Sequence, residues 1–165
     1  MGSSYSYLNV WAVSSIVTAT SDDIERVLKV YEKTYREKQS VVVELPQDGA
    51  ESEPITVNYT IREDDFLKIL HDEEFQESDI DLLINLFRLI DNRGFREIDL
   101  RDVLISFTVL IATSIDHCFE FSMKLIEREG TNIIDKLQLV HIFKLLNAVF
   151  HYFGDKYLQM DQIQD

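Results

Sequence analysis

The chain has 165 residues, of which 45% are hydrophobic, and this composition excludes disorder along its whole length. Its 16 basic and 30 acidic residues leave a net charge of −14, which argues against nucleic acid and anionic membranes as partners and favours a basic protein or peptide. A single cysteine, Cys118, excludes an intrachain disulfide framework and is typical of a reducing, cytoplasmic compartment.

The N-terminal arm, residues 1–20, shows no clear helix or strand pattern. Its first six residues fit the pattern for myristoylation of Gly2, but Met-Gly-Ser-Ser also begins many vector-derived leaders, so both interpretations stay open. The arm lacks the basic segment of a signal peptide. No apolar run in the sequence is long enough for a transmembrane segment.

A first helix is predicted from about residue 22 to residue 38, because Thr20 and Asp23 form a capping pair ahead of it. Apolar residues then follow at helical spacing. The expected buried stripe consists of Ile24, Val27, Leu28, Tyr31 and Tyr35.

Two apolar runs come next, Val41–Leu45 and Ile55–Tyr59, on either side of an acidic segment with Pro and Gly. This pattern predicts a small β-hairpin over residues 40–60. Thr60–Arg62 follows as a short extended segment, and a helix is expected through residues 65–70.

The centre of the chain predicts two helices around a polar stretch. The first begins at a cap formed by Ser78 and Asp81, and its stripe consists of Ile80, Leu83, Phe87 and Ile90. The polar stretch covers residues 91–102, and residues 103–111 are apolar at most positions.

The last third of the chain repeats this order. A helix is expected from Ser114 and Ile115, and a polar stretch covers residues 127–138. The next helix, residues 137–153, is apolar on more than one face, and Gly154 is predicted to end it before a further helix begins.

A helix, a polar loop of about twelve residues with isoleucine at the eighth position, and a second helix resemble an EF-hand. Residues 22–165 resemble the multi-hand sensors of the calcineurin B-like and calaxin-like kinds, and Asp116–Phe121 is similar to the start of their third hand. The alternative is an ordinary helical bundle.

The resemblance implies an all-α fold of EF-hand-like helix–loop–helix pairs. Residues 21–112 would form one pair with the hairpin inserted in its first loop, and residues 113–165 would form a third unit and the start of a further helix. In such a pair, Ile98 and the Thr60–Arg62 segment would join in a short β-bridge. The third unit would pair with another chain, unless the sequence is part of a longer protein.

Calcium binding by the central loop is not expected. Carboxylates stand at positions 1, 9 and 12 of the loop, as Asp91, Asp99 and Asp102. Positions 3, 5 and 6, which should hold two ligands and a glycine, are Arg93, Phe95 and Arg96. Two guanidinium groups would therefore stand where the cation should bind.

The third loop departs less from a calcium loop. Its candidate ligands are Glu127, Glu129, Thr131, Asp135 and Gln138. Gln138 at position 12 offers no bidentate carboxylate, so the sequence leaves open weak calcium binding and predicts no other cofactor.

Catalytic patterns are not found in the sequence. Cys118 and His117 are adjacent on a helix and point apart, and the four histidines lack metal-binding spacing. A phosphate loop, a dinucleotide fingerprint and a nucleophile elbow are not present, so we expect a protein that is not an enzyme.

The resemblance instead implies an adaptor or regulatory subunit that holds an amphipathic, basic helix of a protein partner in an apolar groove. Ciliary dynein docking components and light chains are examples of such adaptors, and a ciliary or cytoskeletal location would follow. The alternative is a calcium-responsive subunit of an enzyme. The candidate groove residues are Phe87, Leu104, Phe107, Leu110, Phe143, Leu146 and Phe150.

Overall fold

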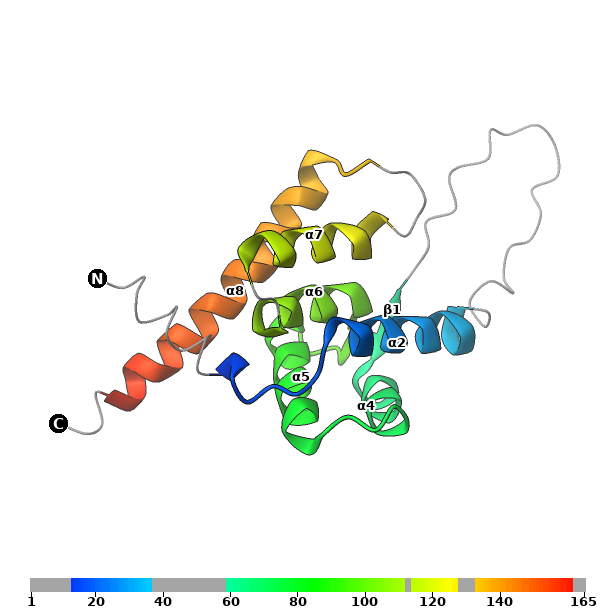
Figure 1. Ribbon diagram of the computed structural model, residues 1–165, viewed down its shortest axis with the longest axis horizontal. Helices are drawn as coiled ribbons and strands as arrows, with labels where there is room; N and C mark the ends of the chain where they lie inside the picture. Colours follow the sequence, from blue (N-terminus) through cyan, green and yellow to red (C-terminus); the bar gives the residue numbers. More distant parts are fainter. Residues whose placement is uncertain (1–12, 37–58, 112–113, 128–132, 162–165) are drawn as a thin grey trace.

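The computed structural model describes residues 13–36, 59–111, 114–127 and 133–161, with side chains described as far as residue 153 (Figure 1). Of the described residues 76% are helical, and two short strands form a small sheet. The prediction of a mostly helical chain is therefore confirmed. Gly2 lies outside the described residues, as does the predicted hairpin apart from its last two residues.

The first helix, α2 (Ser21–Tyr31), begins where the sequence predicts. The backbone N–H and the hydroxyl of Thr20 both donate to the Asp23 carboxylate, at 2.7 and 2.9 Å. A π-helical turn, η1 (Glu32–Arg36), continues it. The predicted stripe faces the core, with Tyr35 partly buried and the others buried, namely Ile24, Val27, Leu28 and Tyr31.

The two strands join segments far apart in the sequence. Strand β1 (Thr60–Arg62) runs antiparallel to β2 (Glu97–Asp99), with Ile61 opposite Ile98. Both isoleucines are buried in the core. The short bridge predicted between these two segments is therefore present.

Helix α4 (Glu63–Asp72) follows β1 directly, and α5 (Glu77–Ile90) precedes β2. The predicted cap of α5 at Ser78 was wrong, because the N-cap is Gln76 and the helix begins two residues earlier than expected, at Glu77. Ser78 lies within the first turn, beside the buried side chain of Asp79.

Helix α7 (Ile115–Ile126) starts as predicted, with the Ser114 hydroxyl accepting a 3.2 Å hydrogen bond from the backbone N–H of His117. The end predicted at Gly154 was wrong, because α8 (Lys136–Asp161) runs through it without a break. A glycine inside a helix costs only about 1 kcal/mol relative to alanine, which favourable neighbours offset.

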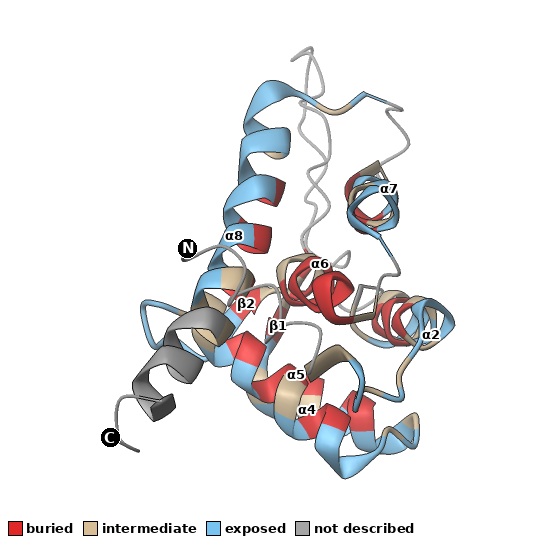
Figure 2. Cartoon of the chain, turned by 60° about the vertical axis from the view of Figure 1, so that its left-hand side comes forward, coloured by how far each residue is buried: buried red, intermediate tan, exposed pale blue. Residues whose placement is uncertain are grey.

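Helix α6 (Leu100–Ile111) is the centre of the core, and nine of its twelve residues are buried. Helices α2, α5, α7 and α8 all pack against it (Figure 2). In the described part of the chain, no helix is both long and apolar enough to cross a bilayer.

A buried carboxylate fixes the position of the residues that precede α2. Asp79 of α5 is only 1% exposed and accepts hydrogen bonds from the backbone N–H groups of Thr18 and Ala19 and from the Thr18 hydroxyl, the shortest at 2.5 Å. Because a buried carboxylate needs such donors, this contact holds residues 18–19 against α5. The sequence analysis missed it, although Asp79 precedes the buried Leu83 by one helical turn.

Replacing Asp79→Ala is expected to lower the free energy of unfolding by about 2–3 kcal/mol, since two backbone N–H groups lose a charged acceptor. Urea unfolding measures the change. The matched control is Asp81→Ala, an exposed neighbour on the same helix, which should change stability by less than about 0.5 kcal/mol. Equal effects of the two substitutions would contradict the role given to Asp79.

Candidate functional site

The central loop folds around the side chain of Asp91. Its carboxylate accepts hydrogen bonds from the backbone N–H groups of Phe95, at 3.1 Å, and Arg96, at 2.7 Å. Gly94 and Arg96 have φ angles of +69° and +56°, in the left-handed region that favours glycine. Asp91 therefore stabilises a sharp turn in which an arginine adopts a conformation suited to glycine.

The second acidic residue of this loop, Asp99, is bound by a neighbouring arginine. The guanidinium of Arg101 contacts both carboxylate oxygens, with a distance of 2.8 Å from one terminal nitrogen to Oδ2. The same guanidinium lies 4.4 Å from the centre of the Tyr59 ring. Asp99 is thus held by a cation that Tyr59 keeps in place.

The third acidic residue, Asp102, faces helix α8. His141 Nε2 lies 2.8 Å from Asp102 Oδ1. This hydrogen bond raises the pKa of His141 above its usual value, against a smaller opposite effect of burial, and the charges of Asp102 and Asp99 raise it further. The carboxylate at the end of the loop thus binds an imidazole of the same chain.

Each of these three carboxylates accepts hydrogen bonds from donors of the protein itself, and these donors compete with a cation for the same oxygens. Calcium needs six to eight oxygen ligands directed at one point. Among the described residues, no group of three or more His, Cys, Asp or Glu side chains lies close enough together to hold a metal ion.

The third loop is described only at its two ends. Glu127 ends α7, whereas Glu129 and Thr131 lie outside the described residues. Asp135 and Gln138 form a capping box at the start of α8, in which each side chain accepts the backbone N–H of the other at 2.8–2.9 Å. In this structure, these two predicted ligands serve to begin a helix.

The structure divides the seven predicted groove residues between core and surface. Five are at most 3% exposed and belong to the core, namely Phe87, Leu104, Phe107, Leu110 and Leu146. They are inaccessible to a partner in this conformation, because four helices enclose α6. Phe150 is partly buried, and Phe143 is 48% exposed.

Exposed apolar side chains occur together on α7 and α8. The Phe119 and Phe143 rings lie 4.8 Å apart and join the two helices. Around this pair, several large side chains are exposed by 37–48%, namely Ile115, Met123, Leu139 and Val140. We call these six residues the α7–α8 apolar face.

A second apolar surface, missed in the sequence analysis, lies between the N-terminal arm and α5. A groove of about 190 Å³ is lined by four apolar side chains, with Asp81, Asn85 and two others adding polar atoms. We call it the arm groove; its apolar residues are Val13, Ile16, Val17 and Leu82. Ile16 is 65% exposed.

Acidic side chains lie beside this groove. Asp81 lines it, and Glu77 and Glu74 lie at the start of α5 and in the turn before it; all three are exposed and make no ion pair in the described part of the chain. Their field is negative, and it favours positively charged ligands near the groove.

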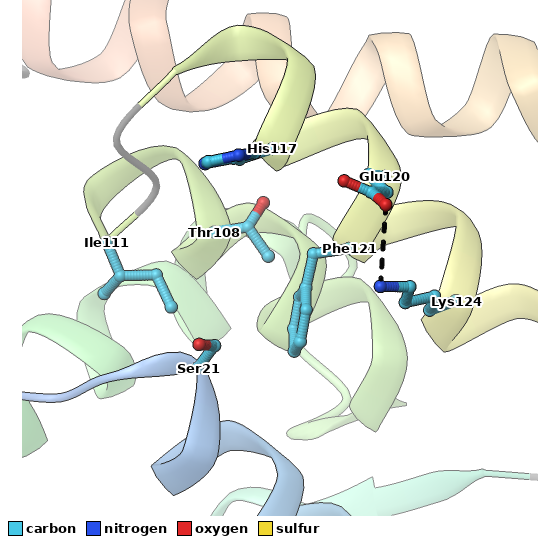
Figure 3. Close-up of a pocket in the computed structure, with 7 residues that line it drawn as sticks. All are labelled: Ser21, Thr108, Ile111, His117, Glu120, Phe121 and Lys124. Atoms are coloured by element: carbon cyan, nitrogen blue, oxygen red, sulfur yellow. Dashed lines mark ion pairs between the residues drawn. The ribbon is translucent and has the colours of Figure 1, made fainter.

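A cavity of about 230 Å³ lies where α2, α6 and α7 meet (Figure 3). The Thr108 hydroxyl at its wall donates to the carbonyl of Ile105 at 2.6 Å, and Glu120 pairs with Lys124 at 3.7 Å. Thr108 and the Glu120–Lys124 pair are thus each bound within the protein.

Cys118 packs behind this cavity and is 2% exposed, with Sγ 2.9 Å from the Thr108 hydroxyl oxygen. Burial raises the pKa of its thiol, against smaller opposite effects of Thr108 and Ser122. A buried thiol with a raised pKa is a poor nucleophile.

Comparisons with known proteins found no matching family model, no matching curated protein and no matching solved structure.

The stabilising effect of His141 on Asp102 is expected to depend on pH. Folding raises the pKa of His141, so the stabilisation that its contact with Asp102 adds to the folded state is complete below the usual histidine pKa of 6.5. This stabilisation is lost as pH rises through the pKa of His141 in the folded protein. His141→Gln should therefore lower the free energy of unfolding more at about pH 5.5 than at about pH 8.5. The difference should stay below about 1 kcal/mol, because His141 is half-exposed.

Urea unfolding at the two pH values measures this difference. The matched control is His71→Gln, which changes an exposed histidine on α4. If His141→Gln lowers the free energy of unfolding more at the higher pH, the direction of the pKa shift attributed to the Asp102 contact is wrong.

Proposed function

We propose that this protein is a non-catalytic, EF-hand-like adaptor or regulatory subunit that binds a basic amphipathic helix of a protein partner without needing calcium. The first support is the arrangement of its N-terminal half. Two helices, α4 and α6, each follow a short strand, and the strands pair with Ile61 opposite Ile98. Such a bridge between two loops is expected of paired EF-hands, and it agrees with the resemblance seen in the sequence.

The central loop gives a second support. A calcium loop needs a sharp turn at its sixth residue, where glycine normally stands. Counted from Asp91, that residue is Arg96, and its φ of +56° is of the kind glycine supplies. This positive φ supports an EF-hand-like loop whose sixth residue has a side chain unsuited to the ion.

The observation that carries calcium independence is the binding of Asp91, Asp99 and Asp102 by donors of the chain itself. A calcium-sensing hand opens when the ion draws in the carboxylate at position 12. Here that carboxylate already contacts His141 of α8. The protein should therefore hold one conformation whether calcium is present or not.

The net charge of the protein and its arm groove indicate which kind of partner it binds. The net charge of −14 attracts basic proteins, and exposed acidic side chains lie beside the groove. An amphipathic helix could insert large apolar side chains between Ile16 and Leu82 while its basic residues approach Glu77 and Asp81. The proposal includes a cytoplasmic, ciliary or cytoskeletal assembly, on the strength of the single cysteine and the calaxin-like resemblance.

Calcium binding is expected to appear when the four unsuitable positions of the central loop are corrected together. The variant Arg93→Asp/Phe95→Asp/Arg96→Gly/Asp102→Glu restores two oxygen ligands, the glycine and a longer carboxylate at position 12. Calorimetric titration should show binding with a dissociation constant of about 10⁻⁴ M or tighter, against none for the unaltered chain.

The matched control adds Asp91→Ala to the same four substitutions and should abolish binding, since Asp91 is the first ligand. A folded four-fold variant that binds no calcium would contradict the EF-hand-like loop. Micromolar calcium binding by the unaltered chain, with a conformational change, would favour the alternative of a calcium-responsive subunit of an enzyme.

The partner's chemistry can be tested with two helical peptides that share one leucine face and carry lysine or glutamate on the other. The protein is expected to bind the lysine peptide and reject the glutamate peptide. Ile16→Asp should weaken binding at least about tenfold by placing a charge in the groove, and Asp81→Lys should do so by reversing a charge beside it. Fluorescence anisotropy measures both.

The control is Glu97→Lys, which makes the same charge change on β2, beyond the far end of α5. It should leave the affinity within about twofold, apart from a small long-range effect. Preference for the glutamate peptide would contradict a basic partner. Equal loss of binding in Glu97→Lys and Asp81→Lys would contradict the arm groove as its site.

A further inference from the structure

We propose that the α7–α8 apolar face binds the same face of a second copy of this chain, around a two-fold axis. This inference does not depend on the proposed function, because it concerns a surface of the C-terminal half away from the arm groove. Most of the face is exposed: five of its six residues are exposed by 37–48%, and only Phe119 is partly buried. Exposed apolar surface of this kind marks an interaction site.

Helical spacing gives the face its form. Ile115, Phe119 and Met123 are four residues apart and form one stripe on α7. Leu139 and Phe143 are also four residues apart and form a second stripe on α8. The contact between the Phe119 and Phe143 rings brings the two stripes side by side. The face is therefore continuous across both helices.

Charges beside the two stripes have opposite signs. Along α7, the acidic side chains of Asp116, Glu120 and Glu127 recur at spacings of four and seven residues and share one side of the helix with Lys124, which pairs with Glu120, so this side has a net negative charge. Along α8, Lys136, Val140 and Lys144 are four residues apart, so the two lysines lie before and after Val140 on the same side of the helix. The face thus has an acidic border on α7 and a basic border on α8.

A second copy complements this pattern. A two-fold axis through the face sets α7 of one copy against α8 of the other, twice, as in any isologous interface. Each acidic border then meets a basic border, and the apolar stripes meet in the centre. A uniformly basic helix would instead face Lys136 and Lys144 along one side, so it fits this face less well.

The charge distribution along the chain agrees with this assignment. Described residues 13–36 and 59–111 contain 17 acidic and 10 basic residues, so two copies would repel each other there. Described residues 114–127 and 133–153 contain four acidic and three basic residues. Repulsion between copies is therefore weakest at the face that exposes the apolar side chains.

Sedimentation velocity of the full chain over a concentration series tests the proposal. The unaltered protein is expected to form dimers, and Phe143→Asp should raise the dissociation constant at least about tenfold by placing a charge in the centre of the interface. The matched control is Phe95→Asp, which changes an exposed phenylalanine in the central loop and should leave dimers unchanged. A protein that stays monomeric at every concentration overturns the proposal.

Charge reversal at the two borders tests the two-fold arrangement; of the four side chains changed, Glu127 is partly buried and the others are exposed. Lys136→Glu/Lys144→Glu makes both borders acidic, and Asp116→Lys/Glu127→Lys makes the α7 border basic like the α8 border. Each variant alone should dimerise at least about tenfold more weakly, because like charges meet twice.

A mixture of the two variants should recover dimers, since every acidic border then meets a basic one. Recovery in the mixture, with loss in each variant alone, supports the two-fold contact between α7 and α8. Dimers that persist unchanged in both single variants, or no recovery in the mixture, overturn it.

Discussion

The structure depends on the burial of α6. Nine of its twelve residues are buried, so the helix must be covered on nearly every side. Each large apolar side chain removed from water contributes about 1.5–3 kcal/mol, and a chain of this size gains most of its stability from such contacts. Helices α2, α5, α7 and α8 provide the cover, and the short bridge between β1 and β2 fixes where α6 begins.

The packing around α6 also determines what the carboxylates of the central loop bind. Because α8 packs on α6, His141 comes within 2.8 Å of Asp102 and supplies a donor to that carboxylate. Arg101 does the same for Asp99, and backbone N–H groups do so for Asp91. The central loop is thus stabilised by the protein's own donors, which supports a fixed conformation.

Two surfaces with different charge result from this packing. The N-terminal half carries most of the unpaired acidic side chains, and its arm groove is held in shape by the contacts of Asp79 with Thr18 and Ala19. The C-terminal half is nearly neutral and exposes apolar side chains around Phe119 and Phe143. Attraction of a basic helix at one surface and self-association at the other would make the protein a two-sided adaptor.

The sequence by itself determined the helical class, the starts of α2 and α7 and the stripe of α2, because helical spacing and capping residues are local signals. The bridge between Thr60–Arg62 and Ile98 was expected only from the resemblance to paired EF-hands. Tertiary structure decided the rest. Phe107 and Phe143 have similar patterns in the sequence, yet one is buried and the other 48% exposed. Their difference depends on which helices cover them, as do the partners of Asp79 and Asp102, which lie 60 and 39 residues away in the chain.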